Sequence, residues 1–215
     1  MNSPPNFNPL ARLYRWMEFL TFGPWLARTR NAFLSEATKA TNALILGDGD
    51  GRFTARLLRA APILSIDTVD ASSAMLHALL HRAGRNASRI RAYHADARAF
   101  LPPNPPYDLI VTHFFLDCLT TAEIQSLAAT IRTFAAPQAR WLVSEFAVPA
   151  NRFGYRVARP LVWSLYWAFG LLTGLTLRQL PDHHAALSQS GFTLQKHRAW
   201  LGGLLVSELW SATPV

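Results

Sequence analysis

The chain has 215 residues, half of them hydrophobic, which excludes a disordered chain and suits one domain with a sizeable core. Its formal net charge is +8, so its partners should be anionic, unless the arginines merely form solvated helix faces. A single cysteine, Cys118, excludes an intrachain disulfide, and residues 1–10 lack the apolar segment of a signal peptide. We therefore expect a cytoplasmic protein.

Residues 1–40 predict a helical cap. Apolar side chains recur at helical spacing from Leu10 to Leu20, and Gly23-Pro24 then separates this helix from a second one over 25–38.

From residue 41 to 147, short apolar runs alternate with helical patterns. Strands are expected at 43–47, 63–69, 90–93, 107–112 and 140–146, with helices at 52–60, 72–83 and 121–135. This alternation predicts a parallel sheet with helices on both faces.

The last third of the chain has a different pattern. Residues 148–181 are aromatic and form a predicted helical insertion, and 182–215 hold a last helix and a β-hairpin. The hairpin runs are 192–200 and 204–210, joined at Gly202-Gly203. We therefore predict an α/β fold in a single domain over 1–215: a Rossmann-like, seven-stranded, mostly parallel sheet with an antiparallel C-terminal hairpin strand.

The stretch LILGDGDGRF at 44–53 is a strand that runs into a glycine loop and then a helix. Gly47, Gly49 and Gly51 allow positive φ or close approach of a ligand, and the following helix offers unpaired N–H groups. This order is typical of a nucleotide-type site. Asp48 and Asp50 in the same loop would repel a pyrophosphate, so they favour a positively charged ligand.

Two further carboxylates follow the next strands. Asp70 stands nineteen residues after Gly51, where a carboxylate can accept from both ribose hydroxyls of an adenosine, or can cap the following helix. Asp96 follows the third strand, where it could accept from the exocyclic amine of adenine or belong to a turn.

Taken in order, five motifs resemble those of class I S-adenosylmethionine-dependent methyltransferases: LILGDGDGRF (44–53), VDASSAML (69–76), HADA (94–97), YDLIVTHFFLD (107–117) and WLVSEF (141–146). The closing helix and hairpin resemble the same family, so the resemblance spans about residues 40–211. Within the class, the chain is most similar to the small-molecule branch that includes ubiquinone/menaquinone-type methyltransferases.

The resemblance implies S-adenosylmethionine as cofactor, with 41–147 as the cofactor-binding core. The implied cofactor-binding residues are Gly47, Asp48, Gly49, Asp50, Gly51, Asp70, Ala71, Met75, Asp96, Ala97, Thr112 and His113. Ile45 departs from the family, which often has an acidic residue there, so Asp48 or Asp50 would take its place near the cofactor's ammonium group. A cofactor with a sulfonium, an ammonium and no phosphate suits these aspartates.

Methyl transfer mainly requires a nucleophile aligned with the S–CH₃ bond, and a base only where the acceptor holds a poorly acidic proton. The catalytic candidates are His113 after the fourth strand and Glu145 at the end of the fifth, although His113 could simply shape the pocket wall. His183 and His184 are adjacent and should point to different faces of a helix, so we expect no metal site.

The aromatic segments outside the core predict a small, apolar or aromatic and hence lipophilic acceptor, unless they pack only on each other. Substrate-binding candidates are Tyr14, Trp16, Phe114, Trp163 and Trp167. Arginines beside these aromatic side chains suggest peripheral association with an anionic membrane at its inner face. We expect no nucleic-acid partner, because no recognition module accompanies the core.

Two alternatives stay open at this point. One is a non-catalytic module that binds S-adenosylmethionine. The other is an NAD(P)-dependent Rossmann oxidoreductase, but its glycines are spaced G-x-G-x-x-G, whereas those here are spaced G-x-G-x-G.

Overall fold

We describe the protein from a computed structural model, which places residues 24–149, 156, 158–160 and 180–213. The helix predicted over Leu10–Leu20 lies outside the described residues, as does most of the aromatic insertion. The candidate acceptor residues Tyr14, Trp16, Trp163 and Trp167 lie outside them as well.

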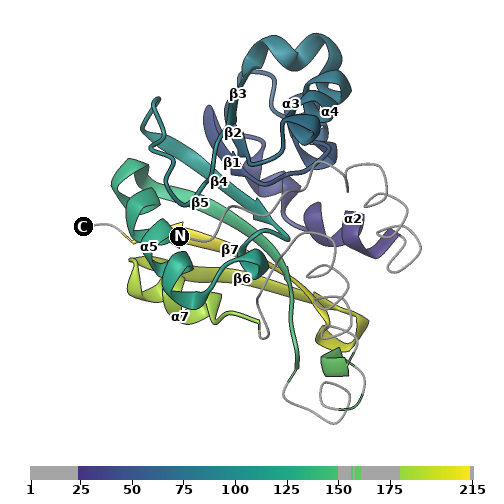
Figure 1. The fold of residues 1–215 in the computed structure, drawn as a ribbon, viewed down its shortest axis with the longest axis vertical. Helices are drawn as coiled ribbons and strands as arrows, with labels where there is room; N and C mark the ends of the chain where they lie inside the picture. Colours follow the sequence, from purple (N-terminus) through teal and green to yellow (C-terminus); the bar gives the residue numbers. More distant parts are fainter. Residues whose placement is uncertain (1–23, 150–155, 157, 161–179, 214–215) are drawn as a thin grey trace.

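A seven-stranded sheet in the order β3-β2-β1-β4-β5-β7-β6 forms the centre of the molecule (Figure 1). The strands are β1 (Asn42–Leu46), β2 (Ser65–Asp70), β3 (Ile90–His94), β4 (Tyr107–His113), β5 (Ala135–Phe146), β6 (Phe192–Trp200) and β7 (Leu205–Ala212). The first five pair in parallel, and β7 runs antiparallel to both β5 and β6. The predicted Rossmann-like α/β fold, with its C-terminal hairpin, is confirmed.

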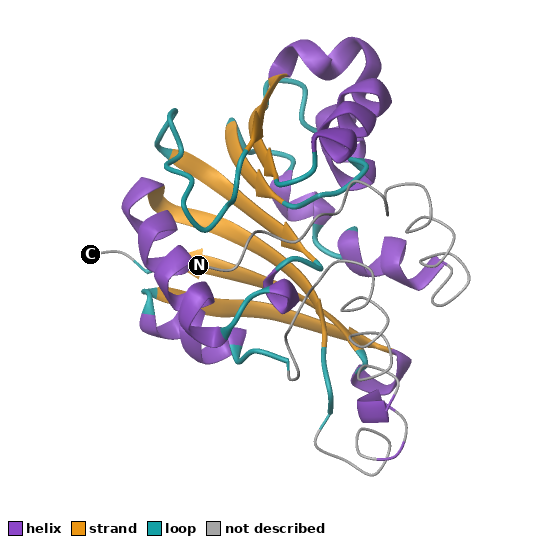
Figure 2. Cartoon of the chain, viewed as in Figure 1, coloured by secondary structure: helices purple, strands orange, loops and turns teal. Residues whose placement is uncertain are grey.

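Helices cover both faces of this sheet (Figure 2). On one face lie α2 (Pro24–Arg30), α3 (Arg52–Ala60) and α4 (Ser73–Ala83), and on the other lie α5 (Thr121–Phe134) and α7 (His183–Gln189). The first face buries Phe53 and Leu57 of α3 against Ile45 and Val111. Strands buried on both sides explain why β1 and β4 read as continuous apolar runs.

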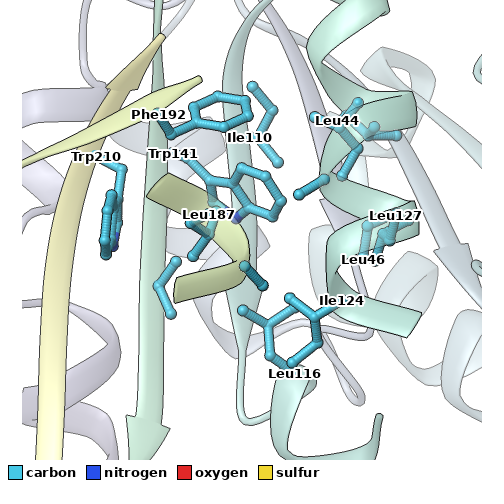
Figure 3. Packing of buried hydrophobic residues seen from close by; sticks show 14 of the residues in the cluster. Leu44, Leu46, Ile110, Leu116, Ile124, Leu127, Trp141, Leu187, Phe192 and Trp210 are labelled. Atoms are coloured by element: carbon cyan, nitrogen blue, oxygen red, sulfur yellow. The ribbon is translucent and has the colours of Figure 1, made fainter. Parts of the chain in front are cut away.

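The core under α5 and α7 is built from alternate residues of the central strands (Figure 3). Trp141 of β5 lies at its centre, fully buried and edge-to-face with Phe192 at 5.0 Å between ring centroids. Its indole N–H donates to Thr112 Oγ1 at 2.9 Å. A buried indole therefore keeps a hydrogen-bond partner within the core.

A capping box determines where α5 begins. The Thr120 hydroxyl accepts from the Glu123 N–H, and the Glu123 carboxylate accepts in turn from the Thr120 N–H at 2.8 Å. The 3-10 turn η4 (Leu116–Cys118) fills the short connection between β4 and this cap. The loop at the end of β4 is thus held at both ends.

Two predicted boundaries differ from the structure by more than two residues. The helix expected over 25–38 ends at Arg30, where Asn31 Nδ2 donates to the Ala27 carbonyl at 2.5 Å, and only a 3-10 turn, η2 (Leu34–Ala37), follows. The Asn31 N–H donates to the same carbonyl at 3.1 Å, and the backbone hydrogen bonds that follow are of the 3-10 type. β5 begins at Ala135 instead of residue 140, directly after α5.

The described ranges contain no helix with both the length and the apolar character that a membrane crossing requires.

Candidate functional site

The candidate site lies where the parallel strands end. Leu46 at the end of β1 pairs with Val69 of β2 on one side and with Thr112 of β4 on the other. The chain leaves β1 toward β2 and β3 and returns on the other side as β4 and β5. Such a reversal of strand order is the place where open α/β sheets bind ligands.

The three loop glycines have different surroundings. A Cβ on Gly51 (φ +75°) would lie 2.8 Å from the backbone Cα of Leu79, so this glycine lets α3 and α4 approach each other. A Cβ on Gly47 would lie 2.5 Å from the Phe115 ring. A Cβ on Gly49 would meet nothing nearer than the Met75 sulfur at 4.0 Å. Gly49 is therefore the loop glycine with an open side toward a ligand.

Asp48 and Asp50 have hydrogen-bond partners within the protein. Asp48 Oδ2 accepts from the Thr54 N–H at 3.0 Å and from the Thr54 hydroxyl at 2.7 Å, at the start of α3. Burial raises the pKa of Asp48 to about 6. Asp50 Oδ2 pairs with Arg52 at 3.1 Å and with Arg82 at 2.8 Å. Both aspartates thus hold the loop against α3 and α4.

Asp70 joins the glycine loop to the next helix. Its Oδ1 accepts from the Ser72 N–H at 2.8 Å, and a backbone hydrogen bond from Gly49 also favours the ionised carboxylate. Burial nevertheless raises the pKa of Asp70 to about 6, with the charge of Asp48 acting in the same direction. The cap of α4 is Ser72, whose hydroxyl accepts from the Met75 N–H. Asp70 is therefore not the N-cap residue of α4.

The implied adenine-side residues follow β2 and β3. The Asp96 carboxylate accepts from Arg98 at 2.6 and 3.0 Å, and Arg98 also reaches Glu123 in the cap of α5 at 2.9 Å. These hydrogen bonds from Arg98 hold the pKa of Asp96 below its usual value. Ala97 is buried and Ala71 is exposed. Arg98 was not singled out in the sequence, although its position two residues after Asp96 suits such a clamp.

Thr112 and His113, at the end of β4, face opposite sides of the sheet. Thr112 Oγ1 accepts from Trp141 in the core, as described above. The His113 ring is 4.5 Å from Phe53 between centroids, and neither ring nitrogen has a hydrogen-bond partner among the described residues. Burial, followed by the charge of Arg30, lowers the pKa of His113 well below its usual value. His113 is therefore a neutral imidazole.

Glu145 supports the loop after β4. Its Oε1 accepts from the N–H groups of Phe115 at 3.1 Å and Leu116 at 2.8 Å, while the side chain is buried. Burial and the neighbouring Asp117 raise the pKa of Glu145 well above its usual value. In the same loop, Phe114 has a φ of +54°. Such backbone strain in a non-glycine residue is common at functional sites.

An aromatic cluster flanks this loop on the α2 side. The Phe114 ring lies 5.1 Å from that of Phe146, and the Arg30 guanidinium lies over Phe114 at 5.2 Å. Trp25 and Trp200, like Phe114 and Phe146, pack against a buried cluster that includes Leu26 and Leu205. Of the candidate acceptor residues, Phe114 is the one that lies within the described ranges.

The expectation that His183 and His184 point apart is wrong. Nε2 of His183 lies 3.2 Å from Glu208 Oε2, and Nε2 of His184 lies 2.6 Å from Glu208 Oε1. The two residues occupy the first turn of α7, above β7, where both rings turn toward the sheet. The argument from helix faces missed this cluster because Glu208 lies far away in the sequence.

Residues 44–141 match a family model described as a methyltransferase domain. No curated protein matches the chain at a significant level. Among solved structures, a candidate O-methyltransferase from Nostoc punctiforme is 16% identical over 98% of this chain and 63% of its own, with a TM-score of 0.75. The chain thus spans under two thirds of that relative's length.

Two other similar structures contain a cofactor or its product. The N-methyltransferase NodS from Bradyrhizobium japonicum, in complex with S-adenosyl-L-homocysteine, is 15% identical over 94% of this chain and 98% of its own, with a TM-score of 0.65. Human N-acetylserotonin methyltransferase, in complex with S-adenosylmethionine, is 18% identical over 94% and 55%, with a TM-score of 0.65.

Residues 44–141 thus match a methyltransferase domain, and the chain as a whole has the fold of S-adenosylmethionine-dependent methyltransferases. The domain match and the ligands of these two structures support S-adenosylmethionine as the cofactor. The matches favour this class over the nicotinamide-dependent oxidoreductase, and they do not distinguish a ubiquinone/menaquinone-type branch.

Proposed function

We propose that the protein transfers the methyl group of S-adenosylmethionine to a small, apolar or aromatic acceptor. The observation that carries the proposal is the pairing of Gly49, whose open side lets a ligand approach, with Asp70, which is partly exposed beside it. A carboxylate in that position can accept from both ribose hydroxyls. Met75 borders the same opening.

The remaining cofactor contacts follow from this placement. Asp96, kept ionised by Arg98, would accept from the adenine amine beyond the end of β3. Asp48 and Asp50 would act by holding the loop in shape, since Thr54 bonds to Asp48 Oδ2, and Arg52 and Arg82 pair with Asp50 Oδ2. The methionine moiety would lie toward the end of β4, past Gly47.

The acceptor would bind beside Phe114, on the α2 side of the loop. Phe114 and Phe146 offer aromatic surface there, and Trp25 and Trp200 extend it. Apolar walls with few polar groups are typical of sites for small lipophilic molecules. The guanidinium carbon of Arg28 lies over the Trp25 ring, 4.7 Å from its centroid. A cation beside an aromatic ring suits a surface that contacts anionic lipid. Co-sedimentation with anionic and neutral vesicles tests this peripheral association.

The two base candidates differ in what they can do. His113 is neutral, and its ring nitrogens are without partners among the described residues, so it could accept a proton from a hydroxyl or amine acceptor. Glu145 is buried and bound to loop amides, so we assign it a positioning role. His113→Asn should then lower kcat, whereas Glu145→Gln, which keeps the accepting oxygen, should change it much less.

Calorimetry with S-adenosyl-L-homocysteine and NADH, on wild type and Asp70→Asn, tests the cofactor site. We expect the protein to bind S-adenosyl-L-homocysteine and not NADH. Asp70→Asn should bind S-adenosyl-L-homocysteine at least tenfold more weakly than the wild type, and equal affinity would refute the site. Transfer of a labelled methyl group is then measured with phenolic, quinol and polar amine acceptors. Binding with no turnover on any acceptor would favour the non-catalytic module.

A further inference from the structure

The side chains of His183, His184 and Glu208 form a cluster away from the cofactor loop, between the first turn of α7 and β7. Their ligand atoms all lie within 4.8 Å of one another. The Glu208 side chain is fully buried, that of His183 is 11% exposed and that of His184 is 50% exposed. The cluster is therefore anchored in the sheet and open to solvent on one side.

The Nε2 atoms of both histidines are directed at the Glu208 carboxylate. Each imidazole presents Nε2 to a different oxygen of Glu208, so both rings and the carboxylate converge on one small space. The Trp210 N–H donates to Glu208 Oε2 at 2.8 Å and holds the carboxylate in this orientation. In metal centres, a residue outside the ligand set commonly forms a hydrogen bond to a ligand and fixes its orientation.

The donor set also matches a metal in number, and its ligand atoms, now within 4.8 Å of one another, would adjust on binding. Two imidazoles and one carboxylate are the protein ligands of one common class of zinc site, which leaves a fourth position open. Zinc–ligand distances of about 2.0–2.2 Å put neighbouring ligand atoms about 3.3–3.6 Å apart around a tetrahedron. The His183–Glu208 separation of 3.2 Å is close to this range, and the His184–Glu208 separation of 2.6 Å needs to open slightly.

We propose that His183, His184 and Glu208 bind a divalent cation of the zinc type, with the fourth position open to water beside His184. The ion would take the position between each Nε2 and the carboxylate that a hydrogen bond now occupies, and each neutral imidazole would carry its proton on Nδ1. It would tie the start of α7 to β7. The test measures metal binding and melting temperature, so it does not depend on methyl transfer.

A second pair of histidines supplies the matched control. His77 and His81 are exposed and stand four residues apart on α4, a spacing that places two imidazoles on the same side of a helix. Such a surface pair can bind zinc weakly without any built site. His81→Ala breaks this pair on the opposite face of the sheet and leaves the cluster on α7 unchanged.

The experiment titrates Zn²⁺ into untagged, metal-free full-length protein against a colorimetric chelating indicator. It compares wild type with His184→Ala, Glu208→Gln and His81→Ala, and follows melting temperature in parallel. We expect one Zn²⁺ per chain, a Zn²⁺-dependent rise in melting temperature, at least tenfold weaker binding in His184→Ala, and wild-type binding in His81→Ala. Binding of S-adenosyl-L-homocysteine by His184→Ala verifies its fold, whatever becomes of Glu208→Gln.

Three results would overturn the proposal. The first is a wild type that binds no Zn²⁺. The second is unchanged affinity in a folded His184→Ala, and the third is loss of binding in His81→Ala, which would assign the ion to the surface pair.

Discussion

Gly49 and Gly51 lie in the same turn of the glycine loop, yet alanine at each should affect different properties of the protein. Both have positive φ, +58° and +75°, so each substitution costs about 1–2 kcal/mol of backbone strain. At Gly51 the new Cβ would also lie 2.8 Å from the Leu79 Cα. That contact is with backbone and cannot be relieved by a rotamer change, so overpacking adds about 1–3 kcal/mol.

Gly51→Ala should therefore lower the free energy of unfolding by about 2–5 kcal/mol, and Gly49→Ala by about 1–2 kcal/mol. Any gain from a stiffer unfolded chain is shared by the two variants and cancels in their difference. For cofactor affinity the order reverses. The Gly49 methyl would project into the opening beside Met75, so binding of S-adenosyl-L-homocysteine should weaken at least tenfold, a loss of about 1.4 kcal/mol.

Urea denaturation and calorimetry on the two variants give the four quantities needed. Wild-type affinity in Gly49→Ala would refute the claim that the ligand approaches this face of the loop. Wild-type stability in Gly51→Ala would refute the close approach of α3 and α4.

Three further predictions concern the site and its supports. Burial raises the pKa of Asp70 to about 6, so the affinity for S-adenosyl-L-homocysteine should fall as the pH drops through that value and the carboxylate becomes protonated. Calorimetry at several pH values measures this, and Asp70→Asn should bind the ligand weakly and with little dependence on pH. Thr120→Ala removes the cap of α5 and should cost about 1 kcal/mol in urea denaturation, with Thr130→Ala, whose hydroxyl only bonds back within the helix, as control. Ile124→Val removes one methyl group from a fully buried site and should cost about 0.5–1.5 kcal/mol in the same assay.

The strands and helices of the core could be predicted because each carries a local signal. The run at 192–200 forms a strand over the same residues, and helix 52–60 has its predicted bounds. The end of α2 was not predictable in this way. The backbone changes to 3-10 hydrogen bonds after Asn31, whereas the apolar spacing continues past it as far as Ala37.

The candidate site was predictable in position but not in the partners of its charged groups. Strand ends followed by glycine or aspartate identified the loops. The sequence does not indicate that Asp48 accepts a hydrogen bond from Thr54, or that Arg82 of the next helix forms an ion pair with Asp50. Contacts between separate elements depend on how those elements pack. For the same reason, the contact of Glu208 with His183 and His184 could not be predicted from the sequence.

These partners change the electrostatic argument for the ligand. Two free aspartates in the loop would have been a strong reason to expect a cation. Asp50 Oδ2 is paired with two arginines, and Asp48 Oδ2 accepts two hydrogen bonds from Thr54, so each aspartate uses one carboxylate oxygen within the protein. Asp70, partly exposed like Asp48 and Asp50, is the carboxylate that we place at the ribose hydroxyls. If the cofactor's charge matters for affinity, the effect should therefore act through Asp70, and Asp50→Asn should affect stability more than binding.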